Sequence, residues 1–231
     1  MDVIIRLLLA HIIGDFFLQP KSCCEAKRER SVKGFFMIGL HALVIAILSY
    51  VVVADWSCWW IPIVVLLSHW LIDIIKSWHE DESASTFLID QLVHITLIGV
   101  IGYCYMGCPK VEFGALSTVK LLYLLSFLLV LKPSSIIIKL FTQQWAPKES
   151  SKISLPNAGK WIGYLERVLI LTFIFAGHVE GIGFLLAAKS IFRFGDLNKS
   201  KDVRTTEYVL LGTFMSFAIS IIIGFGIKWL I

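Results

Sequence analysis

The chain has 231 residues, of which 57% are hydrophobic and only 16% are charged, and its mean hydropathy is +0.80. A water-soluble domain carries about a quarter of its residues as charged ones, so this composition excludes an ordinary soluble globular protein. The formal net charge of +4 gives no reason to expect a nucleic-acid partner.

Eight apolar segments follow one another along the chain, and each is predicted to be a membrane-spanning helix. They cover residues 2–19, 35–54, 59–76, 87–107, 116–132, 161–178, 182–195 and 207–230. The seventh is short for a bilayer core of ~30 Å, but the stretch "AGHVEGIG" predicts a tight hairpin between the sixth and seventh segments. The predicted fold is an all-α transmembrane bundle of about eight spans, with the lipid bilayer as its main partner.

The segments are expected to form a single membrane domain over residues 1–231. Residues 1–132 hold the first five spans, and residues 161–231 hold the last three. Between them, residues 133–160 begin with "PSSIIIKLFTQQW", whose pattern predicts an amphipathic helix lying on the cytoplasmic surface, followed by a loop.

Lysine and arginine gather in alternate connections between the segments, which therefore lie on one side of the membrane. These connections contain Lys21, Lys27, Arg28, Arg30 and Lys33, then Lys132, Lys139, Lys148, Lys152 and Lys160, then Arg193, Lys199, Lys201 and Arg204. Because positively charged loops stay on the cytoplasmic side, this side is predicted to be cytoplasmic and both termini to lie outside.

Four histidines and three aspartates lie within the first four apolar segments. In "HIIGD" and "HWLID" the aspartate follows the histidine by four residues, and in "DQLVH" the order is reversed. Four residues make about one helical turn, so the two side chains share a helix face. Measured from the cytoplasmic ends, the histidines lie ~9–12 Å deep and the aspartates ~4–6 Å deep. We therefore expect one layer of His11, His41, His69 and His94, and a second of Asp15, Asp73 and Asp90.

Imidazole and carboxylate groups together favour a divalent transition metal, with zinc as the first choice and iron or manganese as alternatives. All seven side chains are candidate ligands, and the three aspartates are also candidate proton acceptors for a metal-bound water. Lys76 lies one turn beyond Asp73 and is expected either to bind an anionic head group or to extend to the interface. Two other interpretations of the histidines and aspartates stay open. They can form a proton relay, or they can neutralise each other between packed helices.

The stretches "HIIGDFFLQ", "HWLIDIIK" and "FLIDQLVH" resemble an uncharacterised bacterial membrane-protein family classed as a domain of unknown function. The motifs H-x-x-G-D-F-x-x-Q, H-x-x-x-D-x-x-K and D-Q-x-x-H carry the resemblance. It implies a place in the bacterial inner membrane and adds Gln19 and Gln91 to the site, but it implies no activity. The helices are more distantly similar, in ligand type alone, to those of membrane metal-dependent hydrolases.

A second group of charged residues lies in the last three segments. Glu166, Arg167 and Lys189 fall at about the same depth as the histidines, with Arg193 one turn from Lys189. Ion pairing between packed helices explains them, and a cationic cradle beside the metal, formed by Lys189 and Arg193, is the alternative.

The function expected from the sequence is the metal-dependent hydrolysis of an amphiphilic, lipid-like substrate, either phosphorylated or not, that is reached from the cytoplasmic leaflet. A proton- or metal-coupled transporter and a metal-stabilised regulatory membrane protein are the alternatives. The enzyme is favoured because a transport pathway needs polar groups through the whole membrane thickness, whereas the outer halves of the first four segments are almost wholly apolar.

Overall fold

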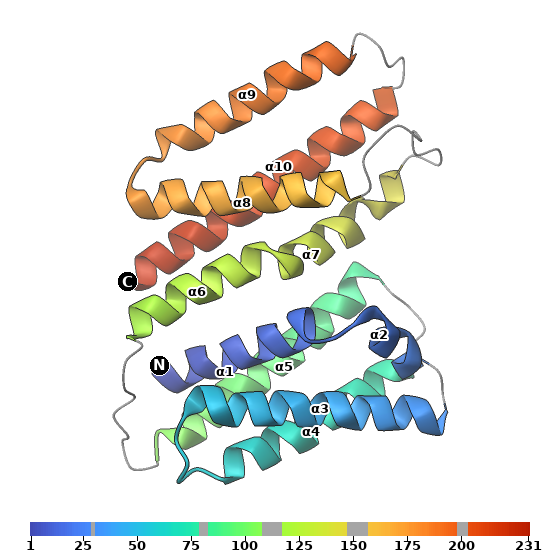
Figure 1. Cartoon of the computed structure of the whole chain (residues 1–231), viewed down its shortest axis with the longest axis vertical. Helices are drawn as coiled ribbons and strands as arrows, with labels where there is room; N and C mark the ends of the chain where they lie inside the picture. Colours follow the sequence, from blue (N-terminus) through green and yellow to red (C-terminus); the bar gives the residue numbers. More distant parts are fainter. Residues whose placement is uncertain (29–30, 79–82, 108–116, 147–156, 198–202) are drawn as a thin grey trace. The chain divides into compact units, whose positions relative to one another are not determined.

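A computed structural model describes residues 1–28, 31–78, 83–107, 117–146, 157–197 and 203–231, without the side chains of residues 21–22, 28, 192–197 and 203–204. All elements in these ranges are helical (Figure 1). They are α1 (Asp2–Ile12), the π-helix η1 (Ile13–Phe17), α2 (Lys21–Arg28), α3 (Val32–Val53), α4 (Trp60–Ser77), α5 (Ala84–Tyr105), α6 (Thr118–Val130), α7 (Lys132–Thr142), the short 3-10 helix η2 (Gln143–Trp145), α8 (Ala158–Ala176), α9 (Glu180–Leu197) and α10 (Val203–Leu230).

The prediction of an all-α fold is confirmed, and each of the eight apolar segments corresponds to a helix. Five helical stretches in the described part of the chain are long and apolar enough to cross a membrane: Val32–Val53, Trp60–Ser77, Ala84–Tyr105, Thr118–Trp145 and Thr205–Leu230. The apolar helices support a membrane protein, and the total of about eight spans stays a prediction.

Large apolar side chains lie exposed on the same helices. They include Leu40, Leu43, Ile47 and Val51 on α3, Leu67 and Leu71 on α4, and Leu88, Ile89 and Leu92 on α5. Soluble monomers rarely expose apolar side chains over such continuous stretches, whereas lipid is a favourable neighbour for them. The exposed surface therefore agrees with the membrane character that the composition predicts.

Two helices, α2 and α7, lie in parts of the sequence where no membrane-spanning helix was predicted. Residues 21–28 were expected to be part of a basic loop, but they form α2, which packs on α3 and buries Cys23 and Ala26. The helix predicted in residues 133–145 is present as α7, and it contacts α10. Its position on a cytoplasmic surface stays a prediction.

The chain divides into two compact units, residues 1–125 and residues 126–231. In the first unit, four helices contact one another as a ring, because α1 contacts α3 and α5, and α4 contacts the same two helices (Figure 1). Gly14 allows the close approach of α1 to α3: a Cβ atom there would lie 2.5 Å from Cγ1 of Ile45. Gly102 of α5 has the same role against Ile4. The sequence thus permits a tight ring at two glycine positions.

At the end of the ring that contains the N-terminus of α1, polar side chains pair with one another and with the backbone. Arg6 donates to Asp2 Oδ2 at 3.0 Å and to the backbone oxygen of Val52 at 2.9 Å. Asp55, in the loop after α3, accepts hydrogen bonds from Ser57 and from the hydroxyl of Tyr105. These bonds, from Ser57 first, lower the pKa of Asp55 below its usual value of 3.8, although burial acts in the opposite direction.

In the second unit, α8 and α9 form the predicted hairpin, and α10 contacts both α7 and α8. Gly177 ends α8 at φ +81°, a left-handed conformation that suits glycine. The helix α6 breaks at Leu131, ahead of Pro133, which cannot donate to the helix. Arg167 of α8 donates to the backbone oxygen of Val130 at this break, which satisfies one of the carbonyl groups that the break exposes.

Candidate functional site

Four helices of the first unit carry the same order of side chains, in steps of four residues or about 6 Å along each axis. Each has an apolar residue, then a histidine and, in three of the helices, an aspartate. The series are Leu7, His11 and Asp15 in α1 and η1; Ile45 and His41 in α3; Val65, His69 and Asp73 in α4; and Ile98, His94 and Asp90 in α5. The ring therefore stacks an apolar, a histidine and a carboxylate layer.

The four histidines meet in one cluster, as the sequence predicted. The ring centroids of His69 and His94 lie 4.4 Å apart, those of His11 and His94 lie 5.0 Å apart, and those of His41 and His69 lie 5.2 Å apart. All four are buried, with exposed fractions of 3–6%. The convergence is confirmed, and the roles of these residues stay predictions.

Three buried side-chain atoms in this cluster have no hydrogen-bond partner among the described residues: Nε2 of His69, Nε2 of His94 and Oδ1 of Asp90. Asp15 Oδ1 lies 3.3 Å from His69 Nε2, which is within ion-pair distance, although this contact does not count as a hydrogen bond. Buried polar atoms are normally paired, because an unpaired one costs about 1–3 kcal/mol. Three such atoms in one cluster are what a ligand-binding site requires.

His94 is held with a lone pair available for a ligand. Its Nδ1 lies 2.9 Å from the backbone oxygen of Asp90, which is an acceptor only, so Nδ1 carries the hydrogen. In the neutral ring Nε2 is then a bare acceptor. Metal-binding histidines are commonly oriented in this way, with one nitrogen bonded to a backbone carbonyl and the other facing the ion.

Asp15 is positioned by a local irregularity of the first apolar segment. Residues 13–17 form a π-helical turn, in which the Leu18 amide donates to the Ile13 carbonyl at 2.9 Å. Such turns shift the side chains that follow by one position and are frequent at functional sites. The carboxylate of Asp15 accepts from His41 Nε2 at 3.1 Å and lies 3.8 Å from His11 Nε2. It therefore orients His41 as well as completing the cluster.

Two lysines cover the carboxylate layer. Lys27 of α2 donates to Asp73 Oδ2, and Lys76 donates to Asp90 Oδ2 at 2.5 Å. Sequence reasoning assigned Lys76 to the site and missed Lys27, which it placed in a loop. The apolar positions of α2, Cys23 and Ala26, three residues apart and next to Lys27, are the signal that predicts a packed helix there.

Both glutamines implied by the family resemblance also contact the cluster. Gln91 Oε1 accepts from His11 Nε2 at 3.3 Å, and Gln91 Nε2 donates to Asp90 Oδ2 at 3.2 Å. Since an amide oxygen is an acceptor, His11 Nε2 carries the hydrogen here. Gln19, with its amide turned to match its neighbours, accepts from Lys27 Nζ at 2.6 Å and donates to the backbone oxygen of Asp15 at 3.3 Å.

The donor atoms form three overlapping sets that can hold a metal ion, and the ligand atoms within each set lie within 4.8 Å of one another. The sets are His11, Asp15 and His69; His41, His69 and Asp73; and Asp73, Asp90 and His94. A tetrahedral zinc ion with bonds of 2.0–2.1 Å spaces its ligands by about 3.3 Å, so binding requires the side chains to draw together. The shared His69 and Asp73 allow one ion or an adjacent pair.

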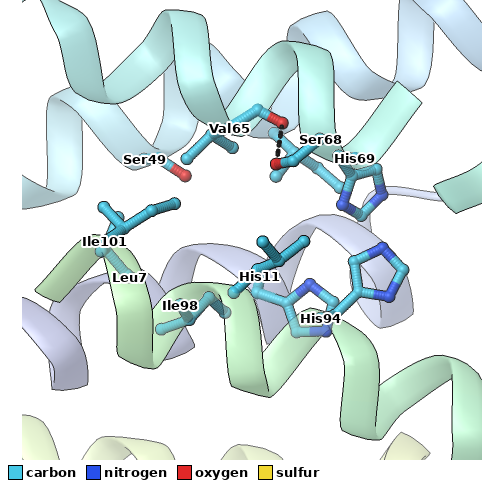
Figure 2. A pocket seen from close by; sticks show the side chains of 11 residues that line it. Leu7, His11, Ser49, Val65, Ser68, His69, His94, Ile98 and Ile101 are labelled. Carbon is cyan, nitrogen blue, oxygen red and sulfur yellow. Dashed lines mark hydrogen bonds between the residues drawn. The ribbon is translucent and has the colours of Figure 1, made fainter. Parts of the chain in front are cut away.

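A small cavity adjoins the histidine layer on its apolar side. Figure 2 shows His11, His69 and His94 at one side of it and Ser49 and Ile101 at the other. The space open to water-sized atoms measures about 20 Å³, which holds a single water molecule. None of the described aspartates lines it. The histidines therefore stand between an apolar cavity and the carboxylates.

The second charged group forms a separate arrangement. Lys189 donates to Glu166 Oε2 at 2.6 Å, so the predicted ion pair between packed helices is present. Lys189 and the histidine cluster belong to different units of the chain. Arg193 lies in α9, but its side chain is outside the described residues.

A family model described as "Protein of unknown function (DUF3307)" matches residues 3–122. The match ends within three residues of the boundary of the first unit, and it includes every described residue of the histidine and carboxylate layers. No curated protein and no solved structure matches the chain.

Proposed function

This chain belongs to the DUF3307 family of proteins of unknown function, and we propose that it is a metal-dependent membrane hydrolase. The proposed substrate is amphiphilic, with a lipid-like tail and an ester or phosphoester group that reaches the histidine cluster. The proposed cofactor is a divalent transition metal, with zinc first and iron or manganese as alternatives.

The three unpartnered buried atoms carry this proposal. Nε2 of His69, Nε2 of His94 and Oδ1 of Asp90 are metal-ligand atoms by type, and each lacks a hydrogen bond within the described residues. A purely structural cluster gains stability by pairing such groups, because burying them unpaired is unfavourable. Metal binding would supply the missing partners, because His94 and Asp90 belong to one of the three candidate sets and His69 belongs to the other two. Imidazole and carboxylate are suitable ligands.

The chemistry follows from the layers. A metal ion held by the histidines would lower the pKa of a water molecule there to about 7. Asp15, Asp73 and Asp90 lie where a carboxylate could accept the proton of that water. The water oxygen would form a bond to the ester carbon or phosphorus as the bond to the leaving oxygen breaks, and the carboxylic acid would return the proton to that leaving oxygen. Lys76 and Lys27 offset negative charge on the substrate.

The proposed membrane arrangement places this site close to one leaflet. We propose about eight spans, made of the five long apolar stretches together with α1 and η1, α8 and α9, in a bacterial inner membrane. The basic loops would then be cytoplasmic. The carboxylate and lysine side would lie nearest the cytoplasm, so a substrate whose tail stays in the inner leaflet needs to move its head group only a short way.

Comparison of lipid extracts tests the hydrolase directly. Strains that carry a deletion, an Asp73→Asn variant or the wild-type gene are compared by mass spectrometry. We expect the same lipid or lipid precursor to accumulate in the deletion and in the Asp73→Asn strain. Glu180→Gln, at an exposed carboxylate of α9, is the matched control and should resemble wild type. A lipid profile that is identical in all four strains contradicts the proposal.

Transport of protons or metal ions is the second candidate, and the cavity is the observation that favours it. Ser49 and Ser68 line the cavity beyond the histidine layer, so polar side chains extend further across the ring than the sequence suggested. Leu7, Val65 and Ile98 line the same cavity and interrupt a continuous polar path. Metal or proton uptake into sealed vesicles that is abolished by His69→Ala would favour transport over hydrolysis.

A further inference from the structure

Lys27 and Lys76 bind the carboxylates that a metal ion would need. Lys27 donates to Asp73 Oδ2 and Lys76 to Asp90 Oδ2. These two aspartates and His94 form one of the sets whose ligand atoms lie within 4.8 Å of one another. Each ammonium group therefore neutralises a carboxylate whose negative charge a bound metal ion would neutralise instead.

A divalent ion at this set weakens both lysine pairs. A divalent cation a few ångströms from an ammonium group repels it, and the low effective dielectric constant of the protein interior strengthens this repulsion. Asp90 Oδ1 has no hydrogen-bond partner in the described structure, so it can bind the ion while Oδ2 still faces Lys76. The Lys76 ammonium group is then repelled by the neighbouring metal ion, and it shares the Asp90 carboxylate with that ion. Both effects favour the release of Lys76 from Asp90.

The two ammonium groups have donors to spare for a new partner. Each carries three N–H groups. Described contacts use two on Lys27, to Asp73 and Gln19, and one on Lys76, to Asp90. The Lys76 side chain is 43% exposed, and that of Lys27 is 12% exposed. The Lys76 side chain is therefore the more accessible of the two to a ligand from outside the ring.

We propose that Lys27 and Lys76 form an anion site that opens when metal binds at Asp73, Asp90 and His94, and that its ligand is a phosphate monoester. This proposal rests on the proposed metal centre and names the substrate class of that site. Two ammonium groups provide two point charges, which match a dianionic phosphate better than a single carboxylate. The chemistry is the same for a free phosphate and for a phospholipid with a terminal phosphate.

Thermodynamic linkage makes the coupling measurable. If metal releases the two lysines for phosphate, then phosphate must strengthen metal binding by the same factor. Couplings between two sites typically span about 5–150-fold, and we expect about tenfold here. Direct contact between phosphate and metal would also produce coupling, but it would not depend on the lysines.

The test measures Co²⁺ binding by isothermal titration in nanodiscs of phosphatidylcholine, with and without inorganic phosphate. In the wild-type protein, phosphate should tighten Co²⁺ binding about tenfold. In the Lys27→Met, Lys76→Met double variant, Co²⁺ should bind more tightly than in wild type without phosphate, and phosphate should have no effect. Lys120→Met, at an exposed lysine of α6, is the matched control and should behave as wild type. The variant with arginine at both positions keeps the charges and should keep the coupling, which guards against a folding defect in the methionine variant.

A second arm uses nanodiscs that contain phosphatidic acid in place of free phosphate and identifies the source of the group. Coupling in this arm alone assigns the site to a membrane phosphate monoester, and coupling in both arms shows that the phosphate alone is sufficient. Either result supports the proposal. Coupling that is absent in wild type, or that persists in the methionine variant, overturns it and leaves the metal centre standing. No Co²⁺ binding to wild type overturns both.

Discussion

The two units bury charged side chains in different ways. In the second unit, Arg167 is buried, and each of its three nitrogens donates to an oxygen: to Val130, to Ser216 at 3.0 Å and to Ser135 at 2.6 Å. In the first unit, the histidine cluster leaves two imidazole nitrogens and a carboxylate oxygen without hydrogen bonds among the described residues. Both groups lie in apolar helices, but within the described part of the chain only the first unit has several such atoms at one point.

The comparison separates a structural polar group from a functional one. Arg167 donates to a carbonyl group that the break between α6 and α7 leaves without its helical partner, so its role is structural. Among the described residues of the second unit, the Tyr164 hydroxyl is a single buried atom without a hydrogen bond, and no other such atom is found in that unit. A ligand site needs several unpaired groups that converge, and the histidine cluster meets this condition.

The largest expected effect is on metal binding. His94→Ala removes a nitrogen that has no other partner, so the affinity for Co²⁺ should fall about 100-fold, close to 3 kcal/mol. His178→Ala, at an exposed histidine of the α8–α9 turn, is the control and should leave the affinity unchanged. Titration of the metal-free protein measures both. Equal affinities for the two variants would mean that the cluster is as structural as the Arg167 group.

The next effect is on stability in the second unit. Arg167→Met removes three hydrogen bonds and leaves the carbonyl group at the α6–α7 break unpaired, which should lower the free energy of unfolding by about 3 kcal/mol. Lys160→Met, at an exposed position of α8, should cost less than about 1 kcal/mol. Unfolding in mixed detergent micelles measures this difference. Co²⁺ affinity should stay at the wild-type value in both variants. A loss of Co²⁺ affinity in Arg167→Met would mean that Arg167 and the histidine cluster depend on each other.

A smaller effect is expected where the ring is tightest. Gly14→Ala puts a Cβ atom 2.5 Å from Ile45 Cγ1, so α1 and α3 must separate, at a cost of about 1–3 kcal/mol. Because Asp15 is the next residue, Co²⁺ affinity should fall as well. Gly99→Ala is the matched control, since its Cβ has no atom within 4 Å, and alanine there should stabilise α5 by about 0.5–1 kcal/mol. Gly14→Ala that keeps full stability and affinity would contradict the close packing.

The smallest effect concerns the paired polar end of the first unit. Asp55→Asn should lower stability by about 1–2 kcal/mol at neutral pH, because Ser57 and Tyr105 donate to the charged carboxylate. The folded-state pKa of Asp55 lies below 3.8, so its contribution is present above the unfolded-state value and is lost as the pH falls through the folded-state value. The stability difference between wild type and variant should therefore shrink below about pH 3.8. Unfolding of both proteins is measured between about pH 3 and pH 7, a range in which carboxylates titrate. A stability difference that stays constant over this range contradicts the assignment.

Much of the first unit could be predicted from the sequence. The apolar runs identified the helices, because length and hydropathy set membrane-spanning helices almost independently of their neighbours. The four-residue spacing in "HIIGD", "HWLID" and "DQLVH" predicted that His11, His69 and His94 meet. The order of histidine and aspartate is reversed on the helix that runs in the opposite direction, so the three histidines lie at the same depth in the membrane.

The rest depended on information that depth along a helix does not contain. The sequence favoured an ion pair of Lys189 with Glu166 and left a cationic cradle beside the metal as the alternative, because depth does not determine which helices are neighbours. The structure contains the pair with Glu166. Lys27 was missed because α2 is a short, charged helix whose position depends on packing against α3. The π-helical turn at Asp15 was missed because a local change in helical winding leaves no periodic signal in five residues.

X-ray absorption at the metal K-edge of protein purified without chelators tests the central claim most directly. We expect a bound divalent transition metal whose nearest ligands include imidazole nitrogens, with metal–nitrogen distances of about 2.0–2.1 Å if the metal is zinc. We also expect the imidazole signal to disappear in the His69→Ala, His94→Ala double variant. Protein free of metal, or metal surrounded by sulfur or by oxygen alone, would contradict the claim that the histidine cluster is a metal centre.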